Sequence, residues 1–276
     1  MKRHLLSTAL ATGLAISMAA PGADAAVITD GDLSVTISET NGAIDQVLFK
    51  SVDFFNPGAP VSDWGIQVGR DASGFGLART SGTSSTPNNI TATTTGPASG
   101  VISATGSFGG ILFQRQYMLL PGANTLRVKT TLARGTAPTG TLVTLFGAYD
   151  PDQDSGFTTS TINDVDNGRI IAIGANRGLI SIIDPVDPPR ALGFSPGGSL
   201  DVDDTGELAA FILGPADPDG ATADDGYIIA YQHAFRGAER VMFTYDHIFA
   251  MPEPGALALL GLGLAGLGFA RRRKAA

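Results

Sequence analysis

The stretch LSVTISETNGAIDQVLF, residues 33–49, decides the fold of this chain. Residues 33–38 alternate strictly between apolar and polar, which is the period of a strand with one buried face. Asn41-Gly42 follows, and residues 44–49 form a second apolar run. Both residues of an Asn-Gly pair tolerate a positive φ, so the pair between two such runs predicts a β-hairpin.

Short apolar runs separated by Gly, Pro, Asn or Asp continue along the rest of the chain. No window between the two termini shows the 3.6-residue period of a helix. Residues 80–100 are nearly all small and polar, and we expect a solvated loop combined with a Thr-rich edge strand. The pattern predicts an all-β fold, a sandwich or a barrel, of which we expect the antiparallel β-sandwich. Further strands are predicted at residues 111–119, 125–132 (after a turn at Pro121-Gly122), 141–149, 169–173, 179–183, 208–213, 227–235 and 240–249.

The last residues, 251–276, contain three features in a fixed order. A turn at Pro252-Glu253-Pro254 is followed by residues 255–270, none of which has a charged or hydrogen-bonding side chain. As a helix these residues extend about 24 Å against a bilayer core of roughly 30 Å, and long basic side chains can reach the interface. Basic residues after such a helix stop transfer and keep the C-terminus in the cytoplasm. The sequence predicts a single C-terminal transmembrane helix with the stop-transfer residues Arg271, Arg272, Arg273 and Lys274.

This C-terminal arrangement resembles the PEP-CTERM sorting signal of Gram-negative bacteria. The resemblance implies that an exosortase, a membrane enzyme, is the partner that processes the chain at or near Pro252-Glu253-Pro254. It also implies a place at the cell surface or in the extracellular matrix, in association with exopolysaccharide or biofilm. The alternative is an ordinary single-span anchor whose Pro-Glu-Pro is a juxtamembrane turn. The resemblance concerns sorting and leaves the task of the remaining chain open.

The N-terminus has the features of a secretory signal peptide. A positive n-region and the apolar residues 5–20 precede Ala23-Asp24-Ala25, an A-x-A site. Cleavage is expected after Ala25, so that the mature chain begins at Ala26. The cleaved signal and the stop-transfer group place the intervening chain outside the inner membrane, anchored in lipid until it is processed. The chain thus divides into an N-terminal signal helix (1–25), an exported β-sandwich domain (26–250) and a sorting and anchor segment (251–276).

The exported domain is acidic and has no cysteine. Residues 26–250 contain 12 lysines and arginines against 24 aspartates and glutamates, a formal net charge of −12. Such a surface argues against nucleic acid and against anionic membrane surfaces as partners. Divalent cations are its natural counterions. Without disulfides, the domain must be held together by packing, hydrogen bonds and any metal that it binds.

The candidate metal ligands lie in a loop after the strand predicted at residues 141–149. Asp150, Asp152 and Asp154 have the 1, 3, 5 spacing of the carboxylates in a calcium loop, so they are the candidate Ca²⁺ ligands. Gly156 comes one place late for an EF-hand loop. Residues 164–168 form a shorter second candidate. The alternative is that these Asp, Pro and Gly residues simply make turns on a solvated face.

The exported domain lacks two common signatures of a hydrolase, because it has no cysteine nucleophile and no metal-binding histidine spacing. His233 and His247 each follow a tyrosine by two residues on a predicted strand, so each shares a face with Tyr231 or Tyr245. Such a pair could line a cleft, but packed or surface histidines are more common. Trp64 is expected to pack in the core. We therefore expect a non-catalytic exported protein.

The opening hairpin resembles the start of the galactose-mutarotase-like sandwiches, which implies a sandwich of that kind. The alternative function is a carbohydrate-binding module or a carbohydrate-active enzyme on the same scaffold, with polysaccharide as the partner. A concave cleft with two facing carboxylates and aromatic platforms would favour that alternative. A convex, Thr-rich surface without a cleft would favour a structural role.

Overall fold

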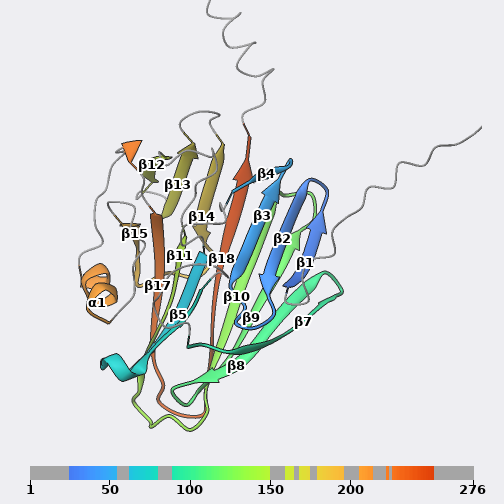
Figure 1. Cartoon of the computed structure of the whole chain (residues 1–276). Coiled ribbons are helices and arrows are strands. Elements are labelled where there is room, and N and C mark those ends of the chain that lie inside the picture. Colours follow the sequence, from blue (N-terminus) through green and yellow to red (C-terminus); the bar gives the residue numbers. More distant parts are fainter. Residues whose placement is uncertain are drawn as a thin grey trace, which may run out of the picture.

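The computed structural model describes residues 25–54, 62–79, 89–149, 159–164, 168–174, 179–195, 205–213, 222–223 and 226–251. Within these ranges the chain forms three antiparallel β-sheets, one α-helix and one short 3-10 helix (Figure 1). The predicted all-β, antiparallel architecture is therefore confirmed.

Among the described residues the largest sheet has nine strands, and the last described strand lies inside it. The strand order is β16-β12-β13-β14-β18-β10-β9-β8-β7. β18 pairs with β10 on one side and with β14 on the other, so it joins the two halves of the sheet. The strands are β7 (Ala92–Ala98), β8 (Val101–Phe108), β9 (Ile111–Leu120), β10 (Thr125–Arg134), β12 (Thr159–Asp164), β13 (Arg169–Gly174), β14 (Ile180–Pro185), β16 (Thr222–Ala223) and β18 (Arg240–Ala250).

Two smaller sheets form the second layer of the sandwich. The five-stranded sheet has the order β15-β17-β11-β5-β6, and the four-stranded sheet is the simple meander β1-β2-β3-β4. The five-stranded sheet contains β5 (Ser62–Val68), β6 (Phe75–Ala78), β11 (Leu142–Tyr149), β15 (Ala191–Ser195) and β17 (Gly226–Ala234), with the 3-10 helix η1 (Ala72–Gly74) between β5 and β6. The four-stranded sheet contains β1 (Ala25–Asp30), β2 (Leu33–Ser38), β3 (Ile44–Phe49) and β4 (Val52–Asp53).

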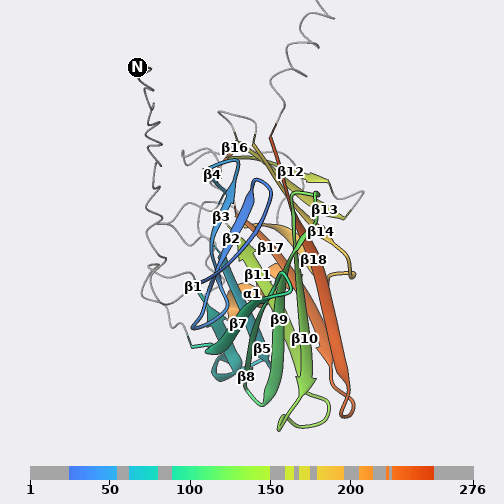
Figure 2. The same cartoon turned by 90° about the vertical axis from the view of Figure 1, so that its right-hand side faces the viewer.

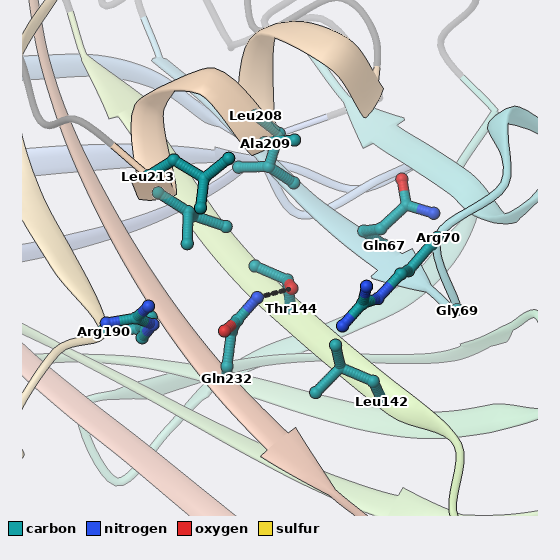
Figure 3. A pocket seen from close by; sticks show the side chains of 11 residues that line it. Gln67, Gly69, Arg70, Leu142, Thr144, Arg190, Leu208, Ala209, Leu213 and Gln232 are labelled. Atoms are coloured by element: carbon teal, nitrogen blue, oxygen red, sulfur yellow. Dashed lines mark hydrogen bonds between the residues drawn. The ribbon is translucent and has the colours of Figure 1, made fainter.

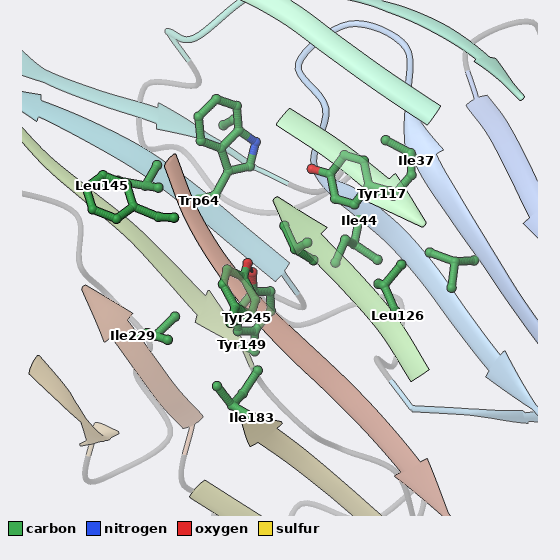
Figure 4. Packing of buried hydrophobic residues seen from close by; sticks show 14 of the residues in the cluster. Ile37, Ile44, Trp64, Tyr117, Leu126, Leu145, Tyr149, Ile183, Ile229 and Tyr245 are labelled. Carbon is green, nitrogen blue, oxygen red and sulfur yellow. Dashed lines mark hydrogen bonds between the residues drawn. The ribbon is translucent and has the colours of Figure 1, made fainter. Parts of the chain in front are cut away.

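Aromatic side chains pack between the two layers (Figure 4), and Figure 2 shows the arrangement of the strands from the side. Trp64 of β5 meets Phe113 of β9 edge-on, with ring centroids 5.2 Å apart, and Tyr231 of β17 stacks on a phenylalanine of β18 at 4.8 Å. Phe54, directly after β4, contacts Phe249 of β18 at 5.2 Å and so ties the four-stranded sheet to the same core. Trp64 is only 1% exposed, which confirms its predicted place in the core.

The predicted opening hairpin is confirmed as β2 and β3. Gly42 has a φ of 72°, and a Cβ there would lie 2.6 Å from the Cβ of Ala104, so the turn requires glycine. Asn41 acts through its side chain instead: its Oδ1 accepts a hydrogen bond from the Ala43 amide, and its Nδ2 donates one to the Arg79 carbonyl. This buried asparagine therefore links the hairpin to the end of β6.

The strand predicted at residues 208–213 is wrong, because these residues lie in helix α1 (Thr205–Leu213). Leu208 and Phe211 are buried, whereas Ala209, Ala210 and Leu213 are exposed, which is the burial period of a helix. Glu207 stands in the first turn, where a carboxylate interacts favourably with the helix dipole. The apolar side of α1 packs on the outer face of the five-stranded sheet, against Phe146 and neighbouring residues, and forms a second, smaller core.

The other predicted strands are confirmed with small shifts at their ends. The Thr-rich stretch forms an edge strand where it is described, since β7 is the outermost strand of the nine-stranded sheet. Among the helices that the structure describes, none is both long and apolar enough to span a bilayer. The helices predicted in the signal peptide and at residues 255–270 lie outside the described residues.

Candidate functional site

A row of polar side chains crosses three strands on the outer face of the five-stranded sheet. Thr144 of β11 pairs in register with Gln67 of β5 on one side and with Gln232 of β17 on the other. Gln232 Nε2 donates a hydrogen bond to Thr144 Oγ1 at 3.0 Å, and Gln67 Nε2 donates one to the Asp71 carbonyl at 2.9 Å. These bonds fix the amides, so the row forms a floor of ordered polar groups.

Helix α1 builds an apolar wall above one end of this floor. Beside the polar row, the same sheet face becomes apolar and is covered by α1. The cavity between the helix and the floor has a volume of about 270 Å³. Its apolar lining comes from Leu142 of β11 and from the α1 residues Leu208, Ala209, Ile212 and Leu213. A ligand in this cavity would therefore meet polar groups on one side and hydrocarbon on the other.

Two arginines flank the cavity. Arg70 follows β5, and Arg190 precedes β15, where its backbone amide bonds to the Ala230 carbonyl at 2.7 Å. Figure 3 shows the two side chains on opposite sides of the Thr144–Gln232 pair. Both are exposed, and neither guanidinium forms an ion pair or a hydrogen bond with the residues that the structure describes. The cavity thus carries positive charge in an acidic protein.

A third arginine, Arg115, is fully buried between the two layers. It stands at an inward position of β9. Its guanidinium donates four hydrogen bonds to hydroxyl groups, one on β9 itself and one each on β10, β11 and β18. The acceptors are Tyr117 Oη at 2.7 Å, Thr130 Oγ1 at 3.0 Å, Tyr149 Oη at 3.1 Å and Tyr245 Oη at 2.6 Å. The charge also lies 5.0 Å from the ring centroid of Trp64. No carboxylate among the described residues is within ion-pair distance.

The hydroxyls around Arg115 are themselves held in place. Tyr117 donates to the Gly42 carbonyl, and the hydroxyls of Tyr149 and Tyr245 share a hydrogen bond. Burial raises the pKa of Tyr117 to about 12 and that of Tyr149 well above its usual value. Tyr117 and Tyr149 therefore remain neutral at ordinary pH, and Arg115 is stabilised by oriented hydroxyl dipoles and ring faces instead of a counterion. The arrangement serves packing, because it is closed to solvent.

The two histidines predicted on strands occupy different environments. His247 is fully buried and meets the ring of Tyr149 edge-on at 4.4 Å. Burial, and secondly the charge of Arg115, lower the pKa of His247 to about 3, so it is neutral. His233 is half-buried, and its Nε2 lies 3.0 Å from Glu239 Oε1. The two are not brought together in one cleft, which agrees with the interpretation of packed or surface histidines.

Most of the predicted site residues lie outside the described residues. This holds for Asp150, Asp152 and Asp154, for Ala23, and for the sorting motif and the stop-transfer residues. Ala25 is the first residue of β1, and Asp150 comes directly after the last residue of β11. Within the described part of the chain, no group of three or more potential metal ligands is found.

No local sequence pattern indicates the cavity under α1. Gln67, Thr144 and Gln232 are ordinary strand residues, far apart in the chain, and only the register of β5, β11 and β17 aligns them. The burial of Arg115, in contrast, could be predicted from the sequence. It shares the alternation of Ile111, Phe113, Tyr117 and Leu119, all on the buried face of β9.

Comparison with solved structures identifies the fold. A bacterial glucoamylase in complex with acarbose is 12% identical, with a TM-score of 0.55 over 87% of this chain and 34% of its own. This chain therefore spans about a third of the length of the glucoamylase. A putative aldose 1-epimerase from Escherichia coli K12 is 10% identical, with a TM-score of 0.52 over 83% of this chain and 99% of its own. At such identities the likeness shows a shared sandwich fold alone, in agreement with the resemblance of the opening hairpin.

Comparison of sequences bears on the C-terminal segment. None of the curated proteins matches the chain significantly. The family model of the PEP-CTERM protein-sorting motif matches residues 252–274, which contain the Pro-Glu-Pro sequence, the apolar run and the basic cluster. The sorting signal expected from the order of these three features is thus confirmed: this chain carries a C-terminal PEP-CTERM protein-sorting motif.

Proposed function

We propose that this is an exported, non-catalytic protein that an exosortase-type enzyme processes near Pro252-Glu253-Pro254. It is held in the membrane by its sorting segment before processing and reaches the cell surface or extracellular matrix afterwards. There it is associated with exopolysaccharide. The observation that carries the proposal is the PEP-CTERM motif at residues 252–274.

The position of the motif relative to the fold supports this proposal. The last described strand, β18, ends at Ala250, and Met251 packs against the main core, so the motif begins directly after the last described residue. Processing there would leave every strand of the described sandwich intact. At the other end, cleavage after Ala25 would remove only the first residue of β1. Both processing sites therefore flank the domain.

Deletion of residues 252–254 is expected to block processing. In a host with an exosortase, the wild-type chain released from the surface should begin at Ala26 and lack Arg271–Lys274. The deletion variant should keep these basic residues and stay in the membrane fraction. Intact-mass analysis of both fractions measures this. Recovery of Arg271–Lys274 on released wild-type protein would show that the processing part of the proposal is wrong.

We further propose that Asp150, Asp152 and Asp154 bind calcium. Three carboxylates at alternate positions directly after β11 would repel one another without a cation. Calcium at ten times its Kd should raise the free energy of unfolding by about 1.4 kcal/mol. Thermal unfolding of the full-length protein with calcium and with EDTA measures the shift. Asp152→Ala should abolish it, whereas Asp32→Asn, in an exposed turn, should not; equal melting midpoints in calcium and EDTA would contradict the site.

A carbohydrate-active enzyme is the second candidate function. It is favoured by the sandwich fold shared with the glucoamylase and the putative aldose 1-epimerase. A screen of the full-length protein against polysaccharides and glycosides separates the two candidates. Turnover that is lost when one carboxylate is changed would establish the enzyme and overturn the non-catalytic assignment.

A further inference from the structure

We propose that the cavity under α1 is a binding site for a sugar that carries a carboxylate group. The proposal deepens the suggested association with exopolysaccharide and rests on it for the class of ligand. The site is defined by the floor residues Gln67, Thr144 and Gln232, the flanking arginines Arg70 and Arg190, and the apolar wall of α1.

The charge of the ligand follows from the two arginines. Two other arginines on the surface of the fold are engaged: Arg127 makes a bidentate pair with Asp246, both bonds at 2.8 Å, and Arg169 lies 3.6 Å from Asp184. Arg70 and Arg190 have no such partner among the described residues, although acids outnumber bases two to one in residues 26–250. A guanidinium matches a carboxylate with two parallel hydrogen bonds, so an incoming carboxylate can satisfy either fork.

The body of the ligand follows from the floor and the wall. Gln232 donates its Nε2 hydrogen to Thr144. The Oε1 atom of the same Gln232 amide is directed away from that bond and can accept a hydrogen bond from a ligand. An acceptor in a cavity favours a ligand with hydroxyl donors, which inorganic anions such as sulfate lack. Across the cavity, Leu213 is 83% exposed at the rim of the apolar wall. A pyranose ring offers both hydroxyls for the floor and an apolar face for this wall.

The size of the cavity limits how much sugar it holds. Its volume of about 270 Å³ is close to the lower end, roughly 300 Å³, of typical small-molecule sites. The cavity is therefore suited to one or a few sugar units and cannot enclose a longer polysaccharide segment. A uronic acid residue within or at the end of a polysaccharide combines the charge, the hydroxyls and the size.

Ligand-observed NMR titration of the full-length protein in non-ionic detergent tests this site. The probes are D-glucuronate and D-galacturonate, the neutral sugars D-glucose and D-galactose, and inorganic sulfate and phosphate. At least one uronate should bind about tenfold or more tightly than its neutral counterpart and than either inorganic anion. At least one of Arg70→Gln and Arg190→Gln should weaken uronate binding about tenfold or more, as expected for loss of a hydrogen bond to a charged group, and the double variant should lose at least as much affinity.

The matched control is Arg240→Gln, because Arg240 is also exposed but lies at the start of β18, outside the cavity lining. It should bind uronate as the wild type does. The proposal is overturned if neither uronate binds, if the control loses as much affinity as the cavity variants, or if sulfate or phosphate binds as tightly as uronate. Sorting is not involved in this measurement. Absence of uronate binding would therefore not contradict exosortase processing, and absence of processing would not contradict uronate binding.

Discussion

Replacing Arg115 by alanine is expected to lower the free energy of unfolding by about 3–5 kcal/mol. The substitution leaves a cavity between β9 and the opposite layer and removes the shared donor of four hydroxyls. Urea unfolding measures the effect through the fluorescence of Trp64, the single tryptophan, which lies beside the guanidinium.

Two further variants separate packing from hydrogen bonding at this position. Arg115→Met fills most of the volume but donates no hydrogen bond, so it should cost about 1–3 kcal/mol. Arg240→Ala, the control on the exposed start of β18, should stay within about 0.5 kcal/mol of the wild type. If Arg115→Ala unfolds within about 1 kcal/mol of the wild type, the buried guanidinium does not hold the two layers together.

Acidification from pH 6.5 to 4.5 is expected to cost the wild-type protein about 2–3 kcal/mol more stability than it costs a His247→Phe variant. The pKa of His247 falls from 6.5 in the unfolded chain to about 3 in the fold, because of burial and secondly the charge of Arg115. Below pH 6.5 the unfolded state therefore binds a proton that the folded state does not. Stability falls with pH across the window from 6.5 to about 3, by at most about 1.4 kcal/mol per pH unit.

Phenylalanine suits this position because the neighbours of His247 are aromatic, including Tyr149 and the stacked ring of Phe249 at 6.1 Å. Urea unfolding of both proteins at several pH values gives the difference between their free energies of unfolding. Titration of the carboxylates contributes equally to both proteins and therefore does not affect this difference. His233→Gln is the control, because it removes a histidine of the fold but keeps His247. Parallel stability curves for the wild type and His247→Phe would refute the assignment of this acid sensitivity.

The strands could be predicted from the sequence because their signal is local. Two-residue alternation in β2 and β9, and turns such as Pro121-Gly122, need no knowledge of partners. The helix α1 was missed because residues 208–213 are apolar without interruption, and such a short run is compatible with a buried strand or a helix. Its i, i+3 pair, Leu208 and Phe211, becomes informative only when the outer face of the sheet is known to need cover.

The candidate site could not be predicted because it depends on long-range register. Thr144 and Gln232 are 88 residues apart, and a shift of one residue in the pairing of β11 and β17 would turn one of them into the core. Arg115 shows the intermediate case. Its inward position follows from alternation, but three of the four hydroxyls that stabilise it come from β10, β11 and β18. Local pattern determines which side chains are buried, and topology determines which of them meet.

The interior position of β18 also determines when, during synthesis and export, the nine-stranded sheet can be completed. Until residues 240–250 are available, β16-β12-β13-β14 and β10-β9-β8-β7 are two separate pieces of sheet, because only β18 lies between them. A chain that leaves a ribosome or an export channel N-terminus first delivers this strand last, immediately ahead of the sorting motif. The largest sheet therefore closes only after nearly the whole chain has emerged, so an unfinished chain remains open at its centre while its C-terminal segment is still being delivered.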